Sequence, residues 1–512
     1  MRFSSLNSVL VCLLLGACAG QSLDPAAVAQ PNYVELPWRV HCETDKSYTP
    51  DLVTIPGVYH GFWTWAEDES GEKLQLHGEL DDGFFLMQTA LTGSGEAMPA
   101  TEATLRKHCL DTIKRHKPTD LARVLAARDS RDLNVAIVYP EERDSAQAVK
   151  RLVLFGDSLT DTGRLKHRMQ IFPGKPYWLG RFSNGPAWPD YLDSATTLSI
   201  QNNAYGGASV ERPAEFMEAG MLGYLKEGGR FFVSGSLGQQ IEVYLQETLN
   251  SAPLTRPEET AFLIWAGAND YISKEPINGL ITTFLNTPED EHGYESVVNT
   301  TLAGIFHEVR ALYSAGARRF ILVNLPDLGR TPIPLQNDTY VSGSGIESEE
   351  GRRIELSRRL SVMTDYHNIR LVKLTNQMKA ELADVDILLV DSNGLTDSIM
   401  AGQLFDNPKS AFDYGFELDA LQQELEDDGH KLNLPKNCYT GMYLGSREDD
   451  DTCEAAATAL FWDVVHPGTY AHCWQAYQIG RVLSDAGWIL PLPAPEDYRS
   501  WCQGYMKRDT RD

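Results

Sequence analysis

Residues 153–165 read VLFGDSLTDTGRL, and this stretch governs how the whole chain is interpreted. Three apolar residues run into Gly-Asp-Ser-Leu, after which the chain becomes polar. Glycine and aspartate are common where a strand turns into a helix, and serine is a good helix N-cap, so one interpretation is purely structural. The other interpretation is that Ser158 is a nucleophile presented at the end of a buried strand. Residues elsewhere in the chain decide between the two.

Four short apolar segments predict a parallel sheet in the C-terminal part of the chain. Each is rich in β-branched and aromatic residues, and long stretches with helical spacing, such as 297–314 and 354–383, separate them. This alternation predicts right-handed crossovers and an α/β fold with helices on both faces of the sheet. Ligands of such sheets bind at the carboxyl ends of the strands, where Ser158 lies. The predicted strands are 152–155, 261–265, 320–323 and 385–390.

Residues 31–148 predict a separate, small α+β domain, because strands and helices do not alternate regularly there. A polar linker over 141–150 follows this domain. We therefore expect a second domain over 150–505. The elements predicted in the front domain are strands at 61–65, 84–87 and 133–139 and a helix at 103–115.

The first 18 residues (1–18) predict an export signal. Arg2 provides a positive start, and residues 9–15 form an apolar run that is too short to span a bilayer. Residues 15–18, Leu-Gly-Ala-Cys, resemble the bacterial lipobox, in which a peptidase cuts before a cysteine that then carries lipid. Ordinary cleavage after Ala19 would instead release a free protein. An outer-membrane lipoprotein lipidated at Cys18 and a secreted protein both stay open, and in either case the mature chain leaves the cytoplasm.

Six cysteines follow Cys18, and an even number in an exported chain predicts disulfides. The number alone leaves several connectivities open, but clustering along the sequence favours one. The favoured pairs are Cys42 with Cys109, Cys438 with Cys453, and Cys473 with Cys502.

The charge of the chain argues against a nucleic-acid partner. The formal net charge is -26, and the sequence contains no basic stripe that could follow a phosphate backbone. Neither Cys-x-x-Cys nor His-Glu-x-x-His occurs. The acidic runs at 424–428 and 449–451 lack the spacing of a calcium loop. We therefore expect no metal ion and no cofactor.

A histidine with a nearby carboxylate is the best candidate base for Ser158. Asp463 and His466 are separated by two valines in an otherwise apolar segment, and Pro467 disfavours helix at His466. The segment therefore predicts a turn. On this turn Asp463 can accept a hydrogen bond from Nδ1 of His466, which leaves Nε2 available as a base.

Two glycine-containing segments are candidates for stabilising an oxyanion. Gly206 and Gly207 allow a backbone N–H to approach a substrate closely. Residues 267–270, Gly-Ala-Asn-Asp, follow a predicted strand directly, and Asn269 offers a side-chain amide donor. We expect both segments in the crevice at the carboxyl ends of the strands.

The ordered set of Gly-Asp-Ser-Leu, glycine, Gly-x-Asn-Asp and Asp-x-x-His-Pro resembles the GDSL or SGNH hydrolase family. Residues 180–185 (GRFSNG) and 324–327 (NLPD) are similar to its larger bacterial branch. The front domain and the 438–453 loop look most like the bacterial lecithin-dependent (thermolabile) haemolysins, relatives of the glycerophospholipid–cholesterol acyltransferases. The lipobox is a departure, because typical haemolysin relatives are released freely. The resemblance implies an SGNH-type α/β/α sandwich with a flavodoxin-like parallel sheet.

The same resemblance implies the roles of the candidate residues. Ser158 would be the nucleophile, His466 the general base and acid, and Asp463 its orienting partner. The oxyanion donors would be the N–H groups of Ser158 and Gly207 and the side chain of Asn269, with Gly206 as an alternative to Gly207. Asp157 would shape the turn, and we expect Ser158 in the first turn of a helix, where the dipole favours an anion.

These features predict an exported serine esterase that acts on membrane phospholipids or lysophospholipids, as a phospholipase A or lysophospholipase. Acyl transfer to a sterol or another alcohol would use the same chemistry. A carbohydrate acetyl esterase is an alternative, because the resembled family also contains such enzymes. The alternative from another class is a non-catalytic membrane-binding or adhesion protein, in which Phe62, Trp63 and Trp65 insert into a membrane interface.

Overall fold

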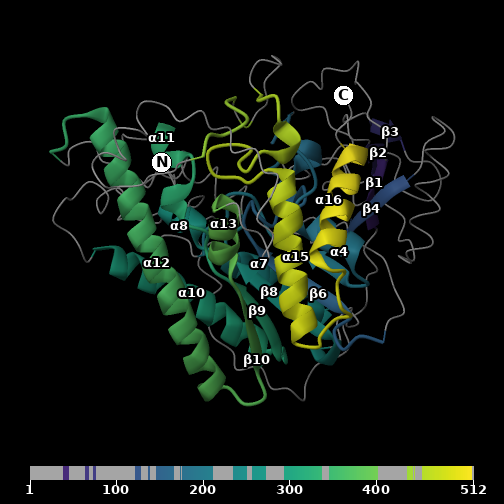
Figure 1. The fold of residues 1–512 in the computed structure, drawn as a ribbon. Helices are drawn as coiled ribbons and strands as arrows, with labels where there is room; N and C mark the ends of the chain where they lie inside the picture. Colours follow the sequence, from purple (N-terminus) through teal and green to yellow (C-terminus); the bar gives the residue numbers. More distant parts are fainter. Residues whose placement is uncertain are drawn as a thin grey trace, which may run out of the picture. The chain divides into compact units, whose positions relative to one another are not determined.

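The protein is described here by a computed structural model, whose fold is drawn in Figure 1. The described residues are 38–44, 64–67, 73–75, 121–128, 137–138, 146–165, 173–174, 176–210, 235–250, 257–272, 293–336, 345–401, 435–441, 443 and 452–509.

Five parallel strands form one half of the sheet, in the order β10-β9-β8-β6-β7. The four predicted strands are confirmed. The apolar runs of β6, β8 and β9 are buried between two helical layers, which is why they lack the alternation of a half-exposed strand, whereas β10 at the edge of the sheet is only partly buried. No range was predicted for β7, which contains a single large apolar residue. The strands are β6 (Arg151–Gly156), β7 (Ser199–Asn202), β8 (Thr260–Trp265), β9 (Arg319–Val323) and β10 (Asp386–Val390).

Helices cover the sheet on both faces, as the α/β prediction requires. The chain runs from β6 to β7, then crosses back to β8, β9 and β10, so right-handed crossovers place α4 on the face opposite α7, α10 and α12. Helix α15 packs against α4 and β10, and α10 packs against both α7 and α12 (Figure 1). These helices are α4 (Trp188–Ala195), α7 (Leu237–Asn250), α10 (Gly293–Ser314), α12 (Glu349–Glu381) and α15 (Thr469–Asp485).

The two predicted long helices are confirmed as α10 and α12. Helix α12 begins five residues earlier than the apolar periodicity indicated, because Ser348 caps it by accepting the N–H of Gly351 at 3.0 Å. Four further helices are α8 (Ala268–Ile272), which directly follows β8, α11 (Ile333–Gln336), α13 (Ser392–Met400) and α16 (Pro495–Asp509) near the C-terminus.

Strand β6 lies at the point where the strand order reverses, between β7 on one side and β8 on the other. The connection that leaves β6 leads to α4 on one face, whereas those that leave β7 and β8 lead to α7 and α10 on the other, and this divergence opens a crevice beyond the carboxyl end of β6. Ser158 lies two residues after the last residue of β6. The fold thus presents Ser158 at the position where α/β sheets bind ligands.

The sheet continues beyond β7 into the front part of the chain. β5 pairs antiparallel with β7, with Val138 opposite Gln201, and β4, β1, β2 and β3 extend the sheet to ten strands. The predicted strand at 133–139 contains β5, and the one at 61–65 overlaps β2. The boundary between domains 31–148 and 150–505 stays a prediction, and the sheet crosses it. The front strands are β1 (Trp38–Thr44), β2 (Thr64–Glu67), β3 (Lys73–Gln75), β4 (Leu121–Arg128) and β5 (Ile137–Val138).

Several predictions fall on residues that the structure does not describe. They include the signal segment 1–18 with Cys18, the elements at 84–87 and 103–115, and the aromatic residues Phe62 and Trp63. Within the described segments, no helix combines the length and the apolar character that crossing a bilayer requires.

Candidate active site

The carboxyl end of β6 is held in place from two sides. The carbonyl oxygen of Trp265 on β8 lies 2.3 Å from where a Cβ on Gly156 would sit, so no larger residue fits there. The side-chain amide of Gln240 on α7 accepts the N–H of Gly156 at 3.0 Å and donates to its carbonyl at 2.9 Å. The glycine of the Gly-Asp-Ser-Leu motif therefore allows close strand approach immediately before the candidate nucleophile.

Replacing Gly156 with alanine is expected to lower the free energy of unfolding by about 1–3 kcal/mol, because the new methyl group meets a backbone carbonyl that cannot swing aside. Urea unfolding monitored by circular dichroism measures this difference. Gly504→Ala is the matched control, since nothing lies within 4 Å of a Cβ at that helical position. Equal midpoints for the two variants would contradict the packing argument.

Ser158 lies on a hydrogen-bonded turn, and the prediction that it occupies the first turn of a helix is wrong. Asp157 accepts the N–H of Leu159 on its side chain at 3.0 Å and the N–H of Asp161 on its carbonyl at 2.9 Å. Helical residues begin only at Arg164. The reason is that Asp161 caps that later helical turn: its carboxylate accepts the N–H groups of Gly163, Arg164 and Leu165 at 2.9, 2.6 and 3.1 Å.

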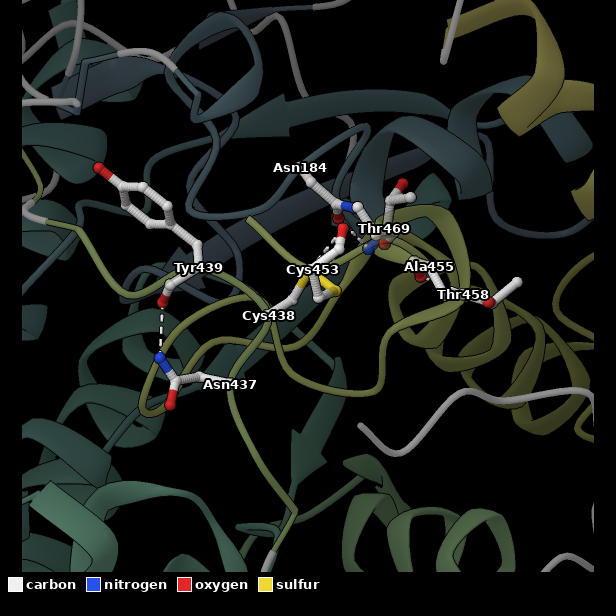
Figure 2. The surroundings of a disulfide bond; sticks show 9 residues. Asn184, Asn437, Cys438, Tyr439, Cys453, Ala455, Thr458 and Thr469 are labelled. Carbon is white, nitrogen blue, oxygen red and sulfur yellow. Dashed lines mark hydrogen bonds between the residues drawn. A yellow bond between two sulfur atoms is a disulfide. The ribbon is translucent and has the colours of Figure 1, made fainter. Parts of the chain in front are cut away.

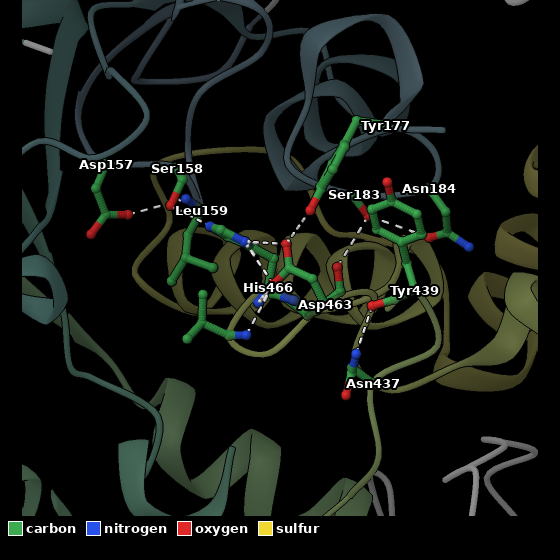
Figure 3. A network of polar contacts seen from close by, with 12 residues as sticks. Asp157, Ser158, Leu159, Tyr177, Ser183, Asn184, Asn437, Tyr439, Asp463 and His466 are labelled. Atoms are coloured by element: carbon green, nitrogen blue, oxygen red, sulfur yellow. Dashed lines mark hydrogen bonds and ion pairs between the residues drawn. The ribbon is translucent and has the colours of Figure 1, made fainter. Parts of the chain in front are cut away.

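The histidine lies on a tight turn that closes on the carboxylate three residues before it. Oδ1 of Asp463 accepts the backbone N–H groups of Val465 and His466 at 2.9 and 2.8 Å. Oδ2 of Asp463 lies 2.7 Å from Nδ1 of His466, and Nε2 of the same ring lies 2.7 Å from Oγ of Ser158 (Figure 3). Because a carboxylate only accepts, Nδ1 carries the ring hydrogen and Nε2 accepts from the serine hydroxyl. The structure therefore joins the three predicted residues in one chain of hydrogen bonds.

The pKa values of two buried carboxyl groups near Ser158 are shifted in opposite directions. Burial raises the pKa of Asp157 to about 6. Burial also opposes ionisation of Asp463, but the charge of His466 and the hydrogen bonds from His466, Val465 and Tyr177 hold the pKa of Asp463 below its usual value. Asp463 is therefore ionised at neutral pH, as a partner of a protonated imidazole needs to be.

Residues 180–185, singled out by sequence resemblance alone, hold the histidine turn from outside. The hydroxyl of Ser183 donates to the carbonyl of Pro467 at 3.1 Å. The side-chain oxygen of Asn184 accepts the N–H of Thr469, where α15 begins, at 2.9 Å (Figure 2). The segment thus fixes the chain directly after His466.

The candidate oxyanion donors lie on the loops that follow β7 and β8. The N–H of Gly206 donates to Asp161 at 2.8 Å, which favours Gly207 over Gly206 as the donor. Gly207 has φ +78°, a conformation that glycine adopts readily. The side-chain nitrogen of Asn269 donates to the carbonyl of Ala208 at 3.0 Å, so one hydrogen bond ties the two loops together.

Two of the three predicted disulfides are present. Cys438 is bonded to Cys453, and Cys473 is bonded to Cys502. The first closes a loop in which Tyr439 pairs with Thr452, and the residue directly before the loop, Asn437, pairs with Phe461. The predicted pair of Cys42 and Cys109 lies outside the residues whose side chains are described. Disulfides are typical of proteins that fold outside the reducing cytoplasm.

Three residues that support the site carried no sequence signal that we recognised: Tyr177, Gln240 and Asp161. Each acts on a partner far along the chain or on a backbone group, so neither spacing nor composition identifies it. Among the described residues, no group of three or more histidine, cysteine or acidic side chains is placed to hold a metal ion. The acidic runs at 424–428 and 449–451 fall outside those residues.

Comparisons with known proteins identify a family that this chain matches. A family model described as GDSL-like Lipase/Acylhydrolase matches residues 152–479. "Phosphatidylcholine-sterol acyltransferase" of Aeromonas hydrophila is 26% identical over 351 residues, which cover 66% of this chain and 92% of that protein. "Thermolabile hemolysin" of Vibrio parahaemolyticus is 22% identical over 413 residues, 80% of each chain.

A third relative is an "Acetylesterase" of Thermothelomyces thermophilus, 27% identical over 202 residues, which cover 38% of this chain and 58% of that protein. The family model includes the Ser158 turn, both glycine-containing loops and the histidine turn within its 152–479 match, which is more than half of the chain. The chain therefore belongs to the GDSL-like lipase/acylhydrolase family of ester hydrolases.

Proposed function

We propose that the protein is a serine esterase in which Ser158, His466 and Asp463 form the catalytic triad. The observation that carries this proposal is the distance of 2.7 Å between Oγ of Ser158 and Nε2 of His466, on a ring whose other nitrogen is hydrogen-bonded to an ionised carboxylate. Serine is a weak nucleophile until a base takes its proton, and this arrangement supplies the base.

The reaction proceeds in two steps. Oγ of Ser158 attacks the carbonyl carbon of the ester while its proton passes to Nε2 of His466, which gives a tetrahedral oxyanion. The carbon–oxygen bond then breaks, and His466 returns the proton to the departing alcohol, leaving an acyl group on Ser158. Water, activated by the same nitrogen, releases the carboxylic acid and restores the serine. Asp463 keeps the imidazole in the required tautomer and stabilises its positive charge.

We propose the N–H groups of Ser158 and Gly207 and the side chain of Asn269 as the oxyanion donors. Replacing Asn269 with alanine is expected to lower kcat by about 10²- to 10³-fold with little change in KM, because the interaction is made mainly in the transition state. Steady-state kinetics on a soluble ester measures this. Asn437→Ala is the control variant. It also removes a side-chain amide, whose nitrogen donates to the carbonyl of Tyr439 and contacts no triad residue in that bond. A loss for Asn269→Ala no greater than for that control would contradict the assignment.

We propose phospholipids or lysophospholipids of a membrane as the substrates. The support comes from two relatives, one named for an acyl transfer from phosphatidylcholine to sterol and one named a hemolysin. The finer assignments, to phospholipase A, lysophospholipase or acyltransferase, differ only in which ester is cleaved and whether water or an alcohol takes the acyl group. The disulfides fit a protein outside the cytoplasm, and we propose that it is secreted or anchored in the outer membrane through Cys18.

A substrate panel tests the proposal. The purified protein is incubated with phosphatidylcholine vesicles, lysophosphatidylcholine and acetylated xylan, and the released fatty acid and acetate are measured. We expect fatty acid from the lipids, together with labelling of Ser158 by an organophosphonate in peptide mass spectrometry. Adding cholesterol separates transfer from hydrolysis, because transfer yields a sterol ester in place of free fatty acid. Labelling at another residue would overturn the mechanism.

A carbohydrate acetyl esterase is the second candidate, and the similarity to an acetylesterase favours it. The triad chemistry is the same, so only the acyl group and the alcohol distinguish the two. Release of acetate from acetylated xylan without release of fatty acid from either lipid would replace the lipid assignment and leave the catalytic residues unchanged.

A further inference from the structure

Tyr177 contacts the triad from a distant part of the sequence. Its hydroxyl lies 2.7 Å from Oδ2 of Asp463, the same oxygen that faces Nδ1 of His466 (Figure 3). The side chain is 3% exposed, and 286 residues separate the two partners. Tyr177 belongs to none of the four motifs that identify the family, whereas Asp463 belongs to the last of them.

The direction of this hydrogen bond is fixed by charge. Burial, followed by the negative charge of Asp463, raises the pKa of Tyr177 far above its usual value, so the phenol keeps its proton. The hydroxyl therefore donates and the carboxylate accepts. Oδ1 accepts two backbone N–H groups and Oδ2 accepts the phenol, while Nδ1 of the imidazole lies 2.7 Å from Oδ2 and 2.9 Å from Oδ1. Hydrogen bonds to both oxygens thus fix the plane of the carboxylate.

Packed aromatic rings determine where the phenol points. The ring of Tyr177 makes edge contacts with Tyr439, Trp462 and Phe182, at centroid distances of 5.5, 6.1 and 6.1 Å. Tyr439 also stacks on Trp462 at 5.2 Å, and Tyr439 follows the disulfide-bonded Cys438. Because close-packed rings leave little freedom, the hydroxyl is preorganised toward the carboxylate.

We propose that Tyr177 is a positioning residue of the esterase reaction, which orients Asp463 and sets how strongly that carboxylate holds the protonated imidazole of His466. The proposal rests on the proposed function of the triad. Tyr177 acts through Asp463 and touches neither the serine nor the substrate carbonyl in this role. Its removal leaves the negative charge of Asp463 with one hydrogen bond fewer, so the carboxylate becomes more basic and less well oriented.

Other titratable groups lie near Asp463 and His466 and also contribute to the pH dependence of the reaction. Asp157 and His472 interact electrostatically with His466, Tyr443 packs its ring against the imidazole at 5.9 Å, and Asp161 acts on Asp157. None of these groups changes when Tyr177 becomes phenylalanine. A difference in the pH profile between the wild type and that variant therefore reports the missing hydroxyl.

Tyr177→Phe tests the proposal on the full chain, with the ester that gives the highest wild-type turnover. We expect kcat to fall about tenfold with KM within about twofold, because the base is less well placed. We also expect the acidic limb of the kcat/KM profile to move to higher pH by roughly half a unit, because a more basic carboxylate holds the protonated imidazole more tightly.

Tyr477→Phe is the matched control. It also removes one hydroxyl from a buried tyrosine, whose partner is the carbonyl of Pro493 at 3.0 Å. We expect this variant to keep both the wild-type kcat and the wild-type acidic limb. A purely structural role of Tyr177 would lower stability or active fraction without moving the limb. The same profile for Tyr177→Phe and Tyr477→Phe would overturn the proposal.

A double substitution shows whether Tyr177 acts through the carboxylate. In an Asp463→Asn background, Tyr177→Phe is expected to lower kcat by less than about twofold further, because the group that it positions is already altered. A further tenfold loss of kcat in that background would show that Tyr177 does not act through Asp463, while leaving the esterase assignment intact. If wild type and Ser158→Ala are equally inactive on every ester, the proposed function fails, and the role of Tyr177 fails with it.

Discussion

Ser158→Ala is expected to lower kcat for ester hydrolysis by about 10⁵- to 10⁶-fold, the largest effect of any single substitution in this chain. Oγ of Ser158 is the atom that bonds to the acyl group in the intermediate. No other described hydroxyl group is hydrogen-bonded to a ring nitrogen of His466. The fold should be unaffected, because the alanine methyl fits wherever the serine Cβ did. Burst kinetics and steady-state turnover on the best ester of the panel measure the loss.

Two variants sharpen this test. Ser392→Ala removes a buried hydroxyl of another serine, whose partner is the side chain of Gln475 at 2.9 Å, and should retain turnover within about twofold. The double variant of Ser158→Ala with His466→Ala should be no slower than Ser158→Ala alone, because residues that act as one unit are not additive. Substantial turnover by Ser158→Ala would mean that the chemistry occurs elsewhere.

The sequence is sufficient to predict the parts of this molecule that depend on local pattern. The strands that carry the core are continuous apolar runs bounded by turns, so β6, β8, β9 and β10 were identifiable. Asp463 and His466 are three residues apart, so a turn brings them together wherever the turn lies. Ser158 and His466 are 308 residues apart, and only the order of the family motifs linked them.

The features that could not be predicted depend on competition between two helix caps or on contacts between residues far apart in the sequence. The Gly-Asp-Ser sequence favours a helix that begins at Ser158, but the carboxylate of Asp161 caps a later turn, so helical residues begin only at Arg164. Strand β7 is short, three of its four residues are polar, and its burial comes from the neighbours that flank it. The contact between Tyr177 and Asp463 leaves no trace in the spacing of either segment.

Arg181→Met is expected to lower the free energy of unfolding by about 3–5 kcal/mol, because it leaves a charge buried without its partner. Arg181 and Asp190 are both 0% exposed, and two parallel hydrogen bonds of 3.0 and 2.8 Å join the guanidinium to the carboxylate. The same carboxylate accepts the N–H of Ala187 at the start of α4, so it cannot turn toward solvent without uncapping that helix. Denaturant unfolding measures the change.

The matched control is Arg310→Met, which breaks an ion pair with Glu381 in which both side chains are almost half exposed. Its unfolding midpoint should stay close to that of the wild type, because water and salt screen exposed pairs. The double variant of Arg181→Met with Asp190→Leu should recover part of the lost stability, since it removes the stranded carboxylate as well. Arg181→Met should also be inactivated by heat sooner than the double variant, and the double variant sooner than Arg310→Met. The reason is that the segment beginning at Arg181 also holds the chain after His466. If Arg181→Met were as stable as Arg310→Met, the buried pair would contribute nothing to the fold, and the support it gives to the histidine turn would have to come from elsewhere.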